Sequence, residues 1–183
     1  MGRIEIRIGG FGGQGIMLAG YLLGQSACIY EDKEATQTET YGPEARGGSA
    51  STEIVISDSE IDYPKLLLPD IAILMSQPAF LKFHKDLKKD GILIIDSDLV
   101  NPNDLKEDIK LCSIPSTQIA QSLGNKIVAN VVMLGALIAI TGVITKEDMI
   151  KSIKTTLPER VLELNLSAFE KGFEAGKQSM NSQ

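Results

Sequence analysis

Glycines are the residues in this sequence whose spacing most directly suggests chemistry. The motif Gly10-x-Gly12-x-x-Gly15 follows an alternating run of isoleucines and precedes an apolar run. A glycine-rich turn between a strand and a helix lets a ligand or another chain approach the backbone, and the first amides of the helix can cradle an anion. The alternative is that the glycines only pack the helix against the strand, because this motif alone is a weak signal. The candidate cofactor-binding residues are Gly10, Gly12, Gly13, Gln14 and Gly15.

A second glycine-rich stretch, residues 41–48, contains three glycines and a proline. This composition predicts a loop with special backbone angles. The loop carries Tyr41 and Arg46, and tyrosine and arginine are preferred anchors at interfaces. The alternative is an ordinary turn in which Arg46 pairs with Glu44 or Glu39. The candidate interface or ligand residues are Tyr41, Gly42, Glu44, Arg46, Gly47 and Gly48.

Length and composition indicate one domain of ordinary size. The chain has 183 residues, of which 43% are hydrophobic, enough for a substantial core. We expect residues 1–178 to form a single domain and residues 179–183 to be a disordered tail. The net charge of −6 argues against nucleic-acid binding. The longest apolar run, residues 127–144, is interrupted by glycines and an asparagine, so we expect a buried helix there and no membrane span.

The two cysteines, Cys28 and Cys112, lie in apolar stretches far apart in the sequence. We expect both to be buried free thiols, which fits a reducing cytoplasm. The chain enters a strand at once, so no signal peptide is expected. Because the sequence has no Cys-x-x-Cys, we expect no iron–sulfur cluster bound by this chain.

The residue types that catalysis needs are sparse. The only histidine, His84, lies in a charged stretch and is expected to be a solvated surface residue. No Walker lysine follows Gly15, and no serine lies in a nucleophile elbow. Asp96 and Asp98 end a predicted strand and could bind a metal or a ribose, but capping of the following turn is favoured. We therefore predict no catalytic residue and no metal ligand in this chain.

Strands and helices are predicted to alternate along the chain. Predicted strands lie at residues 4–8, 34–40, 51–57, 69–75, 92–95 and 109–115, and predicted helices begin near residues 16, 77, 116, 125, 145 and 158. The short link before the third strand suggests an antiparallel neighbour. The alternation indicates an α/β fold, namely a Rossmann-like three-layer sandwich with a mostly parallel sheet and helices on both faces. In the last helix, Leu162, Leu166, Phe169 and Phe173 form one apolar stripe, which core packing and a subunit interface explain equally well.

Taken together, the two glycine motifs resemble the gamma subunit of 2-oxoacid:ferredoxin oxidoreductases, the pyruvate/ketoisovalerate oxidoreductase gamma family. The predicted strand beginning Pro69-Asp70, the Ser76-Gln77 pair, and Asn130 within the apolar helix also match. The resemblance covers nearly the whole chain. The form Tyr-Gly-Pro-Glu-Ala-Arg-Gly-Gly of the second motif is most like the 2-oxoglutarate branch.

This resemblance implies a multi-subunit enzyme that converts a 2-oxoacid and coenzyme A to an acyl-CoA and CO2 and passes electrons to ferredoxin. It implies that thiamine diphosphate, Mg²⁺ and iron–sulfur clusters are bound by the alpha, beta and delta subunits. The gamma chain would bind no cofactor alone, would be inactive when isolated, and would complete the assembly, bordering the coenzyme A site. A homodimer of the isolated chain is left open.

Two other interpretations of the glycine turn compete with this one. The chain could be a free-standing NAD(P)-binding protein, because Glu39 lies about where an acid that binds the ribose is expected. It could also be a regulatory nucleotide-binding module. Co-purification with large subunits that carry thiamine diphosphate and clusters would separate the first interpretation from these two.

Overall fold

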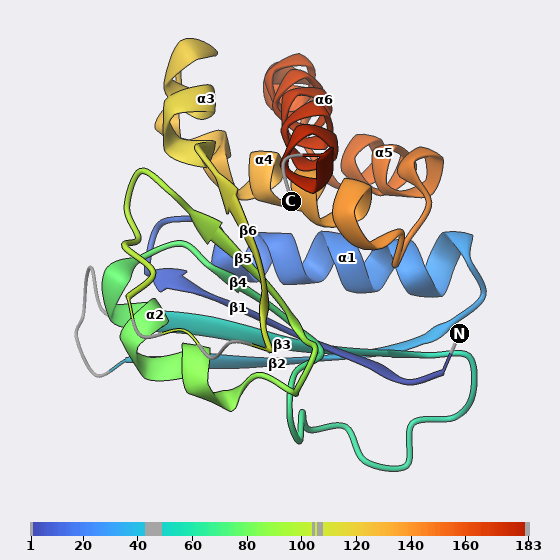
Figure 1. Cartoon of the computed structure of the whole chain (residues 1–183). Coiled ribbons are helices and arrows are strands. Elements are labelled where there is room, and N and C mark those ends of the chain that lie inside the picture. Colours follow the sequence, from blue (N-terminus) through green and yellow to red (C-terminus); the bar gives the residue numbers. More distant parts are fainter. Residues whose placement is uncertain (1, 43–48, 104, 106–107, 182–183) are drawn as a thin grey trace.

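The computed structural model describes residues 2–42, 49–103, 105 and 108–181. The elements in chain order are β1 Ile4–Phe11, α1 Ile16–Tyr30, β2 Glu34–Tyr41, β3 Ser49–Ser57, β4 Ile71–Leu74, α2 Gln77–Phe83, the 3-10 helix η1 His84–Asp86, β5 Ile92–Asp96, β6 Lys110–Ile114, α3 Ser116–Ser122, the 3-10 helix η2 Lys126–Val128, α4 Ala129–Thr141, α5 Lys146–Thr156 and α6 Glu159–Asn181. Figure 1 shows one sheet with most of the helices on one face and α2 on the other.

The strands form one sheet in the order β2-β3-β1-β4-β5-β6. The pairs β1–β4, β4–β5 and β5–β6 are parallel, while β3 lies antiparallel to both β1 and β2. The predicted three-layer α/β fold with a mostly parallel sheet is confirmed, as is the antiparallel placement of the third strand. The first strand is longer than predicted: β1 includes Gly9 and Gly10, because β3 pairs with it as far as Phe11.

Alternating side chains of the central strands enter two different cores. Ile6 and Ile8 of β1 point to the layer that contains α1, α4, α5 and α6. In β4, Ile73 points to that layer, whereas Leu74 points to a smaller core under α2. A strand covered on both faces needs apolar residues at every position, which explains the continuous apolar run of β4.

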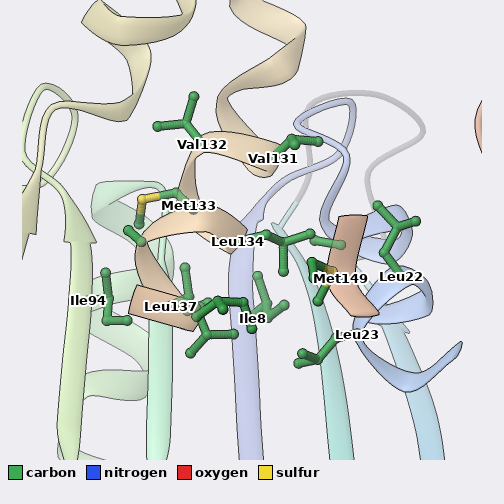
Figure 2. Close-up of a cluster of buried hydrophobic side chains, with 14 of the residues drawn as sticks. Ile8, Leu22, Leu23, Ile94, Val131, Val132, Met133, Leu134, Leu137 and Met149 are labelled. Atoms are coloured by element: carbon green, nitrogen blue, oxygen red, sulfur yellow. The ribbon is translucent and has the colours of Figure 1, made fainter. Parts of the chain in front are cut away.

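The larger core is built around α4, which lies between the sheet and α6. Figure 2 shows Leu134 and Leu137 of α4 facing Ile8 of the sheet, with Leu23 of α1 and Met149 of α5 beside them. Almost every residue of α4 is buried, so this helix has no solvent-facing side. The predicted buried helix is thereby confirmed, with its first turn in the 3-10 conformation.

Helix α6 covers the outer side of α4 at very short range. A methyl group at Gly172 would overlap the carbonyl of Val132, and one at Gly135 would overlap the carbonyl of Phe169. The predicted apolar stripe of α6 faces inward, with Phe169 fully buried, so core packing accounts for it. The helix continues to Asn181 and enters the segment 179–183 that was expected to be disordered, because Met180 still packs against the core.

Two single-residue predictions were wrong. His84 is buried, because it lies four residues after Phe80, stacks on that ring at 4.5 Å and places its Nδ1 2.7 Å from the Phe80 carbonyl oxygen. Cys28 is exposed, because α1 lies over the β2 side of the sheet and the outward face of the helix is uncovered. Cys112 is buried as predicted.

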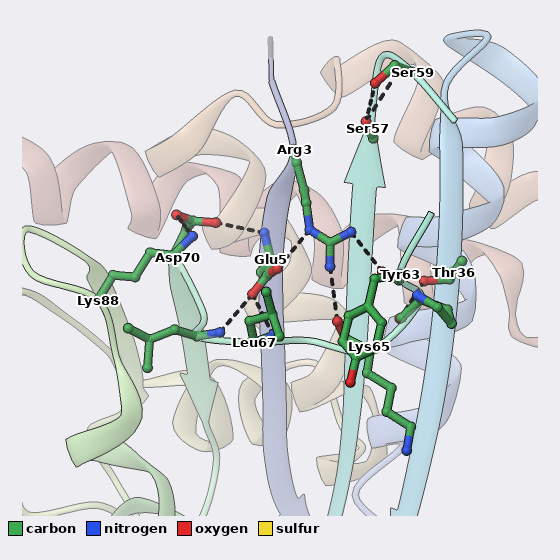
Figure 3. Close-up of polar contacts among 12 residues, drawn as sticks. Arg3, Glu5, Thr36, Ser57, Ser59, Tyr63, Lys65, Leu67, Asp70 and Lys88 are labelled. Atoms are coloured by element: carbon green, nitrogen blue, oxygen red, sulfur yellow. Dashed lines mark hydrogen bonds and ion pairs between the residues drawn. The ribbon is translucent and has the colours of Figure 1, made fainter. Parts of the chain in front are cut away.

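On the α2 face of the sheet, two side chains hold the segment 58–70 between β3 and β4. They are Glu5 of β1 and Arg3, which lies just before β1. The Glu5 carboxylate accepts hydrogen bonds from the amides of Leu67 and Leu68, both at 2.9 Å, and from Arg3 Nε at 2.8 Å. Arg3 also donates to two carbonyls of the same segment. Figure 3 shows these contacts converging on Glu5. Burial raises the pKa of Glu5, but the hydrogen bonds from Arg3 and the two amides outweigh it, so the pKa is lowered.

We predict that Glu5→Gln lowers the free energy of unfolding by about 1–3 kcal/mol at neutral pH, because Arg3 loses its charged partner and one acceptor oxygen is replaced by an NH2 group that faces donors. The folded-state pKa lies below the ordinary value of 4.5, so the charged form contributes fully above that value and its contribution is lost as the pH falls through the lowered pKa. The difference between wild type and variant should therefore shrink below about pH 4.5. Urea unfolding across this pH range measures it.

Glu60→Gln is the control, since Glu60 is an exposed carboxylate of the same segment. This change should alter stability by less than about 0.5 kcal/mol. Equal effects of the two substitutions would contradict the role given to Glu5.

Candidate functional site

The glycine turn joins β1 to α1 through residues 12–15. The amide of Gln14 donates to the carbonyl of Phe11 at 3.1 Å, which closes the turn. Gly15 is the N-cap of α1 and has a left-handed backbone with φ of 73°, while Gly13 has φ of 99°. Both angles disfavour residues with side chains. Within the described residues, no side chain caps the first turn of α1, and that turn contains no acidic residue, so its first amides could bind an acceptor.

The side chain of Gln14 bridges the ends of two neighbouring parallel strands. Its Oε1 accepts a hydrogen bond from the Phe11 amide at 2.6 Å, and its Nε2 donates to the Met75 carbonyl at 3.0 Å. The helices that follow β1 and β4 lie on opposite faces of the sheet. In open α/β sheets this switch in direction creates the crevice where ligands bind. Here the protein's own Gln14 amide bridges the two strand ends.

Packing explains two glycines of the motif. A methyl group at Gly10 would lie 2.5 Å from Gln14 Oε1. At Gly15, a methyl group would overlap the carboxamide of Asn130, whose Nδ2 donates to the Gly15 carbonyl at 3.0 Å. Gly13 differs, because nothing lies within 4 Å of a methyl group placed there. The turn is therefore tight on its inner side and open on its outer side.

Two cavities flank the outer side of the turn. One of about 270 Å³ lies beside the start of α1 and is lined by Phe11, Gly12, Gly13, Gly15, Ile16, Met17, Leu18, Tyr41 and Ala50. The other, of about 260 Å³, is lined by Gly13, Gln14, Leu99, Thr117, Lys126, Ile127 and Ala129. Large apolar side chains around them are solvent-exposed, with 65% of Tyr41 and 67% of Ile127 accessible. A surface of glycine backbone with an exposed apolar rim is suited to contact with another chain or ligand.

The second candidate loop is described only at its edges. Tyr41 ends β2, and its hydroxyl donates to Glu39 at 2.8 Å; this hydrogen bond is the main reason that the pKa of Tyr41 is raised. The Gly42 amide donates to the Ser49 carbonyl at 2.7 Å, which closes the hairpin between β2 and β3. The other candidates lie outside the described residues, so their roles stay predictions; they are Glu44, Arg46, Gly47 and Gly48.

Asp96, the last residue of β5, and Asp98, two residues later, act as structural acceptors. Asp96 is fully buried and accepts hydrogen bonds from the Thr117 hydroxyl at 2.6 Å and the Asp98 amide at 3.1 Å. Asp98 in turn accepts from the Gln118 amide at 2.7 Å. The favoured capping interpretation is confirmed. Within the described part of the chain, no group of three or more histidine, cysteine or acidic side chains could hold a metal. None of the described helices combines the length and hydropathy needed to cross a membrane.

Three residues at this site lie outside the glycine motif and were not among the predicted site residues. Met75 supplies an acceptor to Gln14, and Leu99 and Ile127 add exposed apolar surface. The carboxyl ends of parallel strands meet at one edge of a sheet, and Met75 and Leu99 follow β4 and β5 there. Met75 ends the predicted strand 69–75 and Leu99 follows the predicted strand 92–95, so these positions at strand ends were a usable signal. Ile127 precedes a buried helix and carried no such signal.

The fold and the turn define a class: a Rossmann-like α/β protein with a glycine-rich strand-to-helix turn at the switch point of its sheet. Residues 5–175 match the model of the pyruvate ferredoxin/flavodoxin oxidoreductase family. The chain belongs to this family.

Similar proteins cover almost the whole chain. The 2-oxoglutarate synthase subunit KorC of Methanocaldococcus jannaschii is 49% identical over 178 residues, which span 96% of this chain and 95% of that subunit. A keto/oxoacid ferredoxin oxidoreductase gamma subunit from Geobacter sulfurreducens superposes with a TM-score of 0.88 at 40% identity, covering 98% and 99% of the two chains. Pyruvate oxidoreductase subunit PORC of Thermotoga maritima superposes with a TM-score of 0.78 at 27% identity, covering 95% and 97%.

These likenesses confirm the resemblance inferred from the two glycine motifs. They favour a subunit of an oxidoreductase over the alternative of a free-standing NAD(P)-binding protein. The hydrogen bonds of Gln14 also argue against a dinucleotide site. Its side chain lies between the two strand ends, where a dinucleotide-binding crevice would open.

We predict that Gly15→Ala destabilises the protein by more than Gly13→Ala. Both substitutions put a side chain on a left-handed backbone, at a cost of about 1–2 kcal/mol. Only the methyl group at position 15 also displaces Asn130. Chemical denaturation of both variants measures the difference.

Combining Gly15→Ala with Asn130→Ala should recover part of the loss, with a coupling energy of about 0.5–3 kcal/mol. Strictly additive effects would show that Asn130 does not set the requirement for glycine at position 15.

Proposed function

We propose that this chain is the gamma subunit of a 2-oxoglutarate:ferredoxin oxidoreductase. The complex would convert 2-oxoglutarate and coenzyme A to succinyl-CoA and CO2 and pass the electrons to ferredoxin. One observation carries the proposal: 49% of residues are identical to a 2-oxoglutarate synthase subunit over 95% of that subunit's length. Pyruvate and ketoisovalerate oxidoreductase subunits are also similar, but at 32% identity or below for those of Methanothermobacter.

In this proposal, thiamine diphosphate, Mg²⁺ and the iron–sulfur clusters belong to the alpha, beta and delta subunits, and this chain completes the assembly. The contact would be made by the turn surface, which we define as Phe11, Gly12, Gly13, Tyr41 and Ile127. These residues combine exposed apolar side chains with accessible glycine backbone. Aromatic residues on such a surface are typical anchors of protein interfaces.

The open amides at the start of α1 give this surface a preference for negative charge. They carry the positive end of the helix dipole, and no side chain among the described residues caps them. We propose that they face a carboxylate of a partner subunit or a phosphate of coenzyme A. Arg46 lies in the loop that follows Tyr41, and its guanidinium would add a planar fork for the same kind of group.

We predict that Tyr41→Ala and Phe11→Ala weaken assembly of the complex at least several-fold, since truncating an interface anchor costs about 2 kcal/mol or more. Tyr63→Ala is the matched control, because Tyr63 is 49% exposed on the segment 58–70 and lies outside the turn surface. Reconstitution with the other subunits, followed by native mass and by the Michaelis constant for coenzyme A, measures the effects.

The outcomes separate the two proposed contacts. Failed assembly with Tyr41→Ala supports the subunit contact, while normal assembly with a raised constant for coenzyme A supports the phosphate contact. Variants that assemble and turn over like the Tyr63→Ala control would overturn the role of the turn surface. Assembly with no turnover on 2-oxoglutarate by the wild-type complex would overturn the substrate assignment.

A further inference from the structure

Strand β2 is an edge of the sheet with an open outer side. It spans eight residues, Glu34–Tyr41, and within the described residues it pairs only with β3. The strand contains no proline and no lysine, the residues that commonly protect an exposed edge from pairing. A long unprotected edge is a template for pairing with another chain.

The hairpin geometry shows which backbone groups face outward. Gly42 and Ser49 form a hydrogen-bonded pair. Because hydrogen-bonded and non-hydrogen-bonded pairs alternate in an antiparallel ladder, the even-numbered residues of β2 bond to β3. The outward amides and carbonyls therefore belong to the odd-numbered residues, which are Ala35, Gln37, Glu39 and Tyr41.

This pattern is symmetric about Thr38. The outward residues lie one and three positions to either side of Thr38, and threonines lie two positions to either side, at 36 and 40. A two-fold axis perpendicular to the sheet at Thr38 would give every outward group a partner in a second copy. The register pairs Thr38 with Thr38, Thr36 with Thr40, Gln37 with Glu39, and Ala35 with Tyr41. From this symmetry we propose that two copies of the chain dimerise by antiparallel pairing of β2 with β2.

The charges of the strand suit this register. Glu39 faces the uncharged side chain of Gln37 in the second copy, so the carboxylate meets no like charge; Gln37 Nε2 itself donates within its own chain to Met17 and Thr52. Glu34 faces position 42, which is a glycine. No glutamate faces a glutamate, and the threonine pairs on the other face of the sheet are a favourable cross-strand combination. Tyr41, the largest side chain, lies opposite Ala35, the smallest.

Helix α1 lies above β2 and adds exposed side chains to the same edge of the sheet. It lies directly over β2, because Gln37 Nε2 donates to the Met17 carbonyl at 3.1 Å and a methyl group at Gly24 would touch Ala35. Of the α1 residues at this flank, Tyr21 and Cys28, seven positions apart, are solvent-exposed, and Met17 is half-buried. Tyr21 is 50% exposed. In the paired sheet, the two α1 helices would lie side by side and cover these residues.

Sedimentation equilibrium of the isolated full chain tests the proposal. Wild type should show twice the chain mass of 19.8 kDa and dissociate on dilution. Thr38→Lys places two ammonium groups against each other at the axis and should raise the dimer dissociation constant by about tenfold or more. Glu39→Pro is a second variant; it removes an outward amide that bonds nothing within the chain, and edge strands tolerate such a change.

Two controls accompany these variants. Thr38→Val keeps a β-branched residue without charge and should remain a dimer, and Gln121→Lys adds the same charge on an exposed position of α3 and should also remain a dimer. Thermal unfolding checks that each variant is folded. A monomeric wild-type chain, or folded Thr38→Lys and Glu39→Pro chains that dimerise like wild type, would overturn the proposal. Tyr41 belongs to β2 and to the turn surface, but this test changes only Thr38 and Glu39 and uses the isolated chain. Neither result therefore decides the role of the turn surface in the complex.

Discussion

The burial of α4 is the constraint on which the rest of the structure depends. A helix that is apolar on every side must be covered on every side, and the sheet, α1, α5 and α6 together provide that cover. The contact with α6 is close enough that Gly135 and Gly172 have no room for a side chain. Such contacts fix the position of α4 to within a fraction of an ångström, because the backbones themselves touch.

That position controls the glycine turn as well. Asn130 lies in the first turn of α4 and donates to the carbonyl of Gly15, where α1 begins. The start of α1 is therefore anchored to the interior of the protein, while Gln14 ties the same turn to the end of β4. The inner side of the turn is held by amide groups, and only the outer side, at Gly12 and Gly13, is open. A motif associated with dinucleotide binding is thus held on its inner side and accessible on its outer side, the side that we propose contacts other subunits.

The two faces of the sheet differ in how they are covered. One face carries the large core, whereas the other is covered by α2 and by the irregular segment 58–70. An irregular segment cannot satisfy its own amides, so side chains from the sheet do so, and the charge of Glu5 is held by Arg3 and two of those amides. Among the described residues no strand pairs with the outer edge of β2, and Tyr21 on the flank of α1 is half-exposed.

The sequence by itself determined the architecture. Isoleucines at every second position specify β1, the uninterrupted apolar residues of β4 specify a strand buried on both faces, and the run before Gly142 specifies the central helix. The paired glycine motifs were also specific enough to identify the family, and the capping role of Asp96 followed from local chemistry. These features depend on periodicity and on neighbours close in the chain.

Only the tertiary structure decided what each polar group contacts. That His84 is buried follows from its stacking on Phe80, and that Cys28 is exposed follows from the place of α1 at the side of the sheet. The separate packing reasons for Gly10 and Gly15 depend on Gln14 and Asn130, and Asn130 is more than a hundred residues away from Gly15 along the chain. Sequence patterns record which residues are apolar and how they are spaced. They do not record which distant side chain reaches a given backbone group, because packing of the whole core decides that distance.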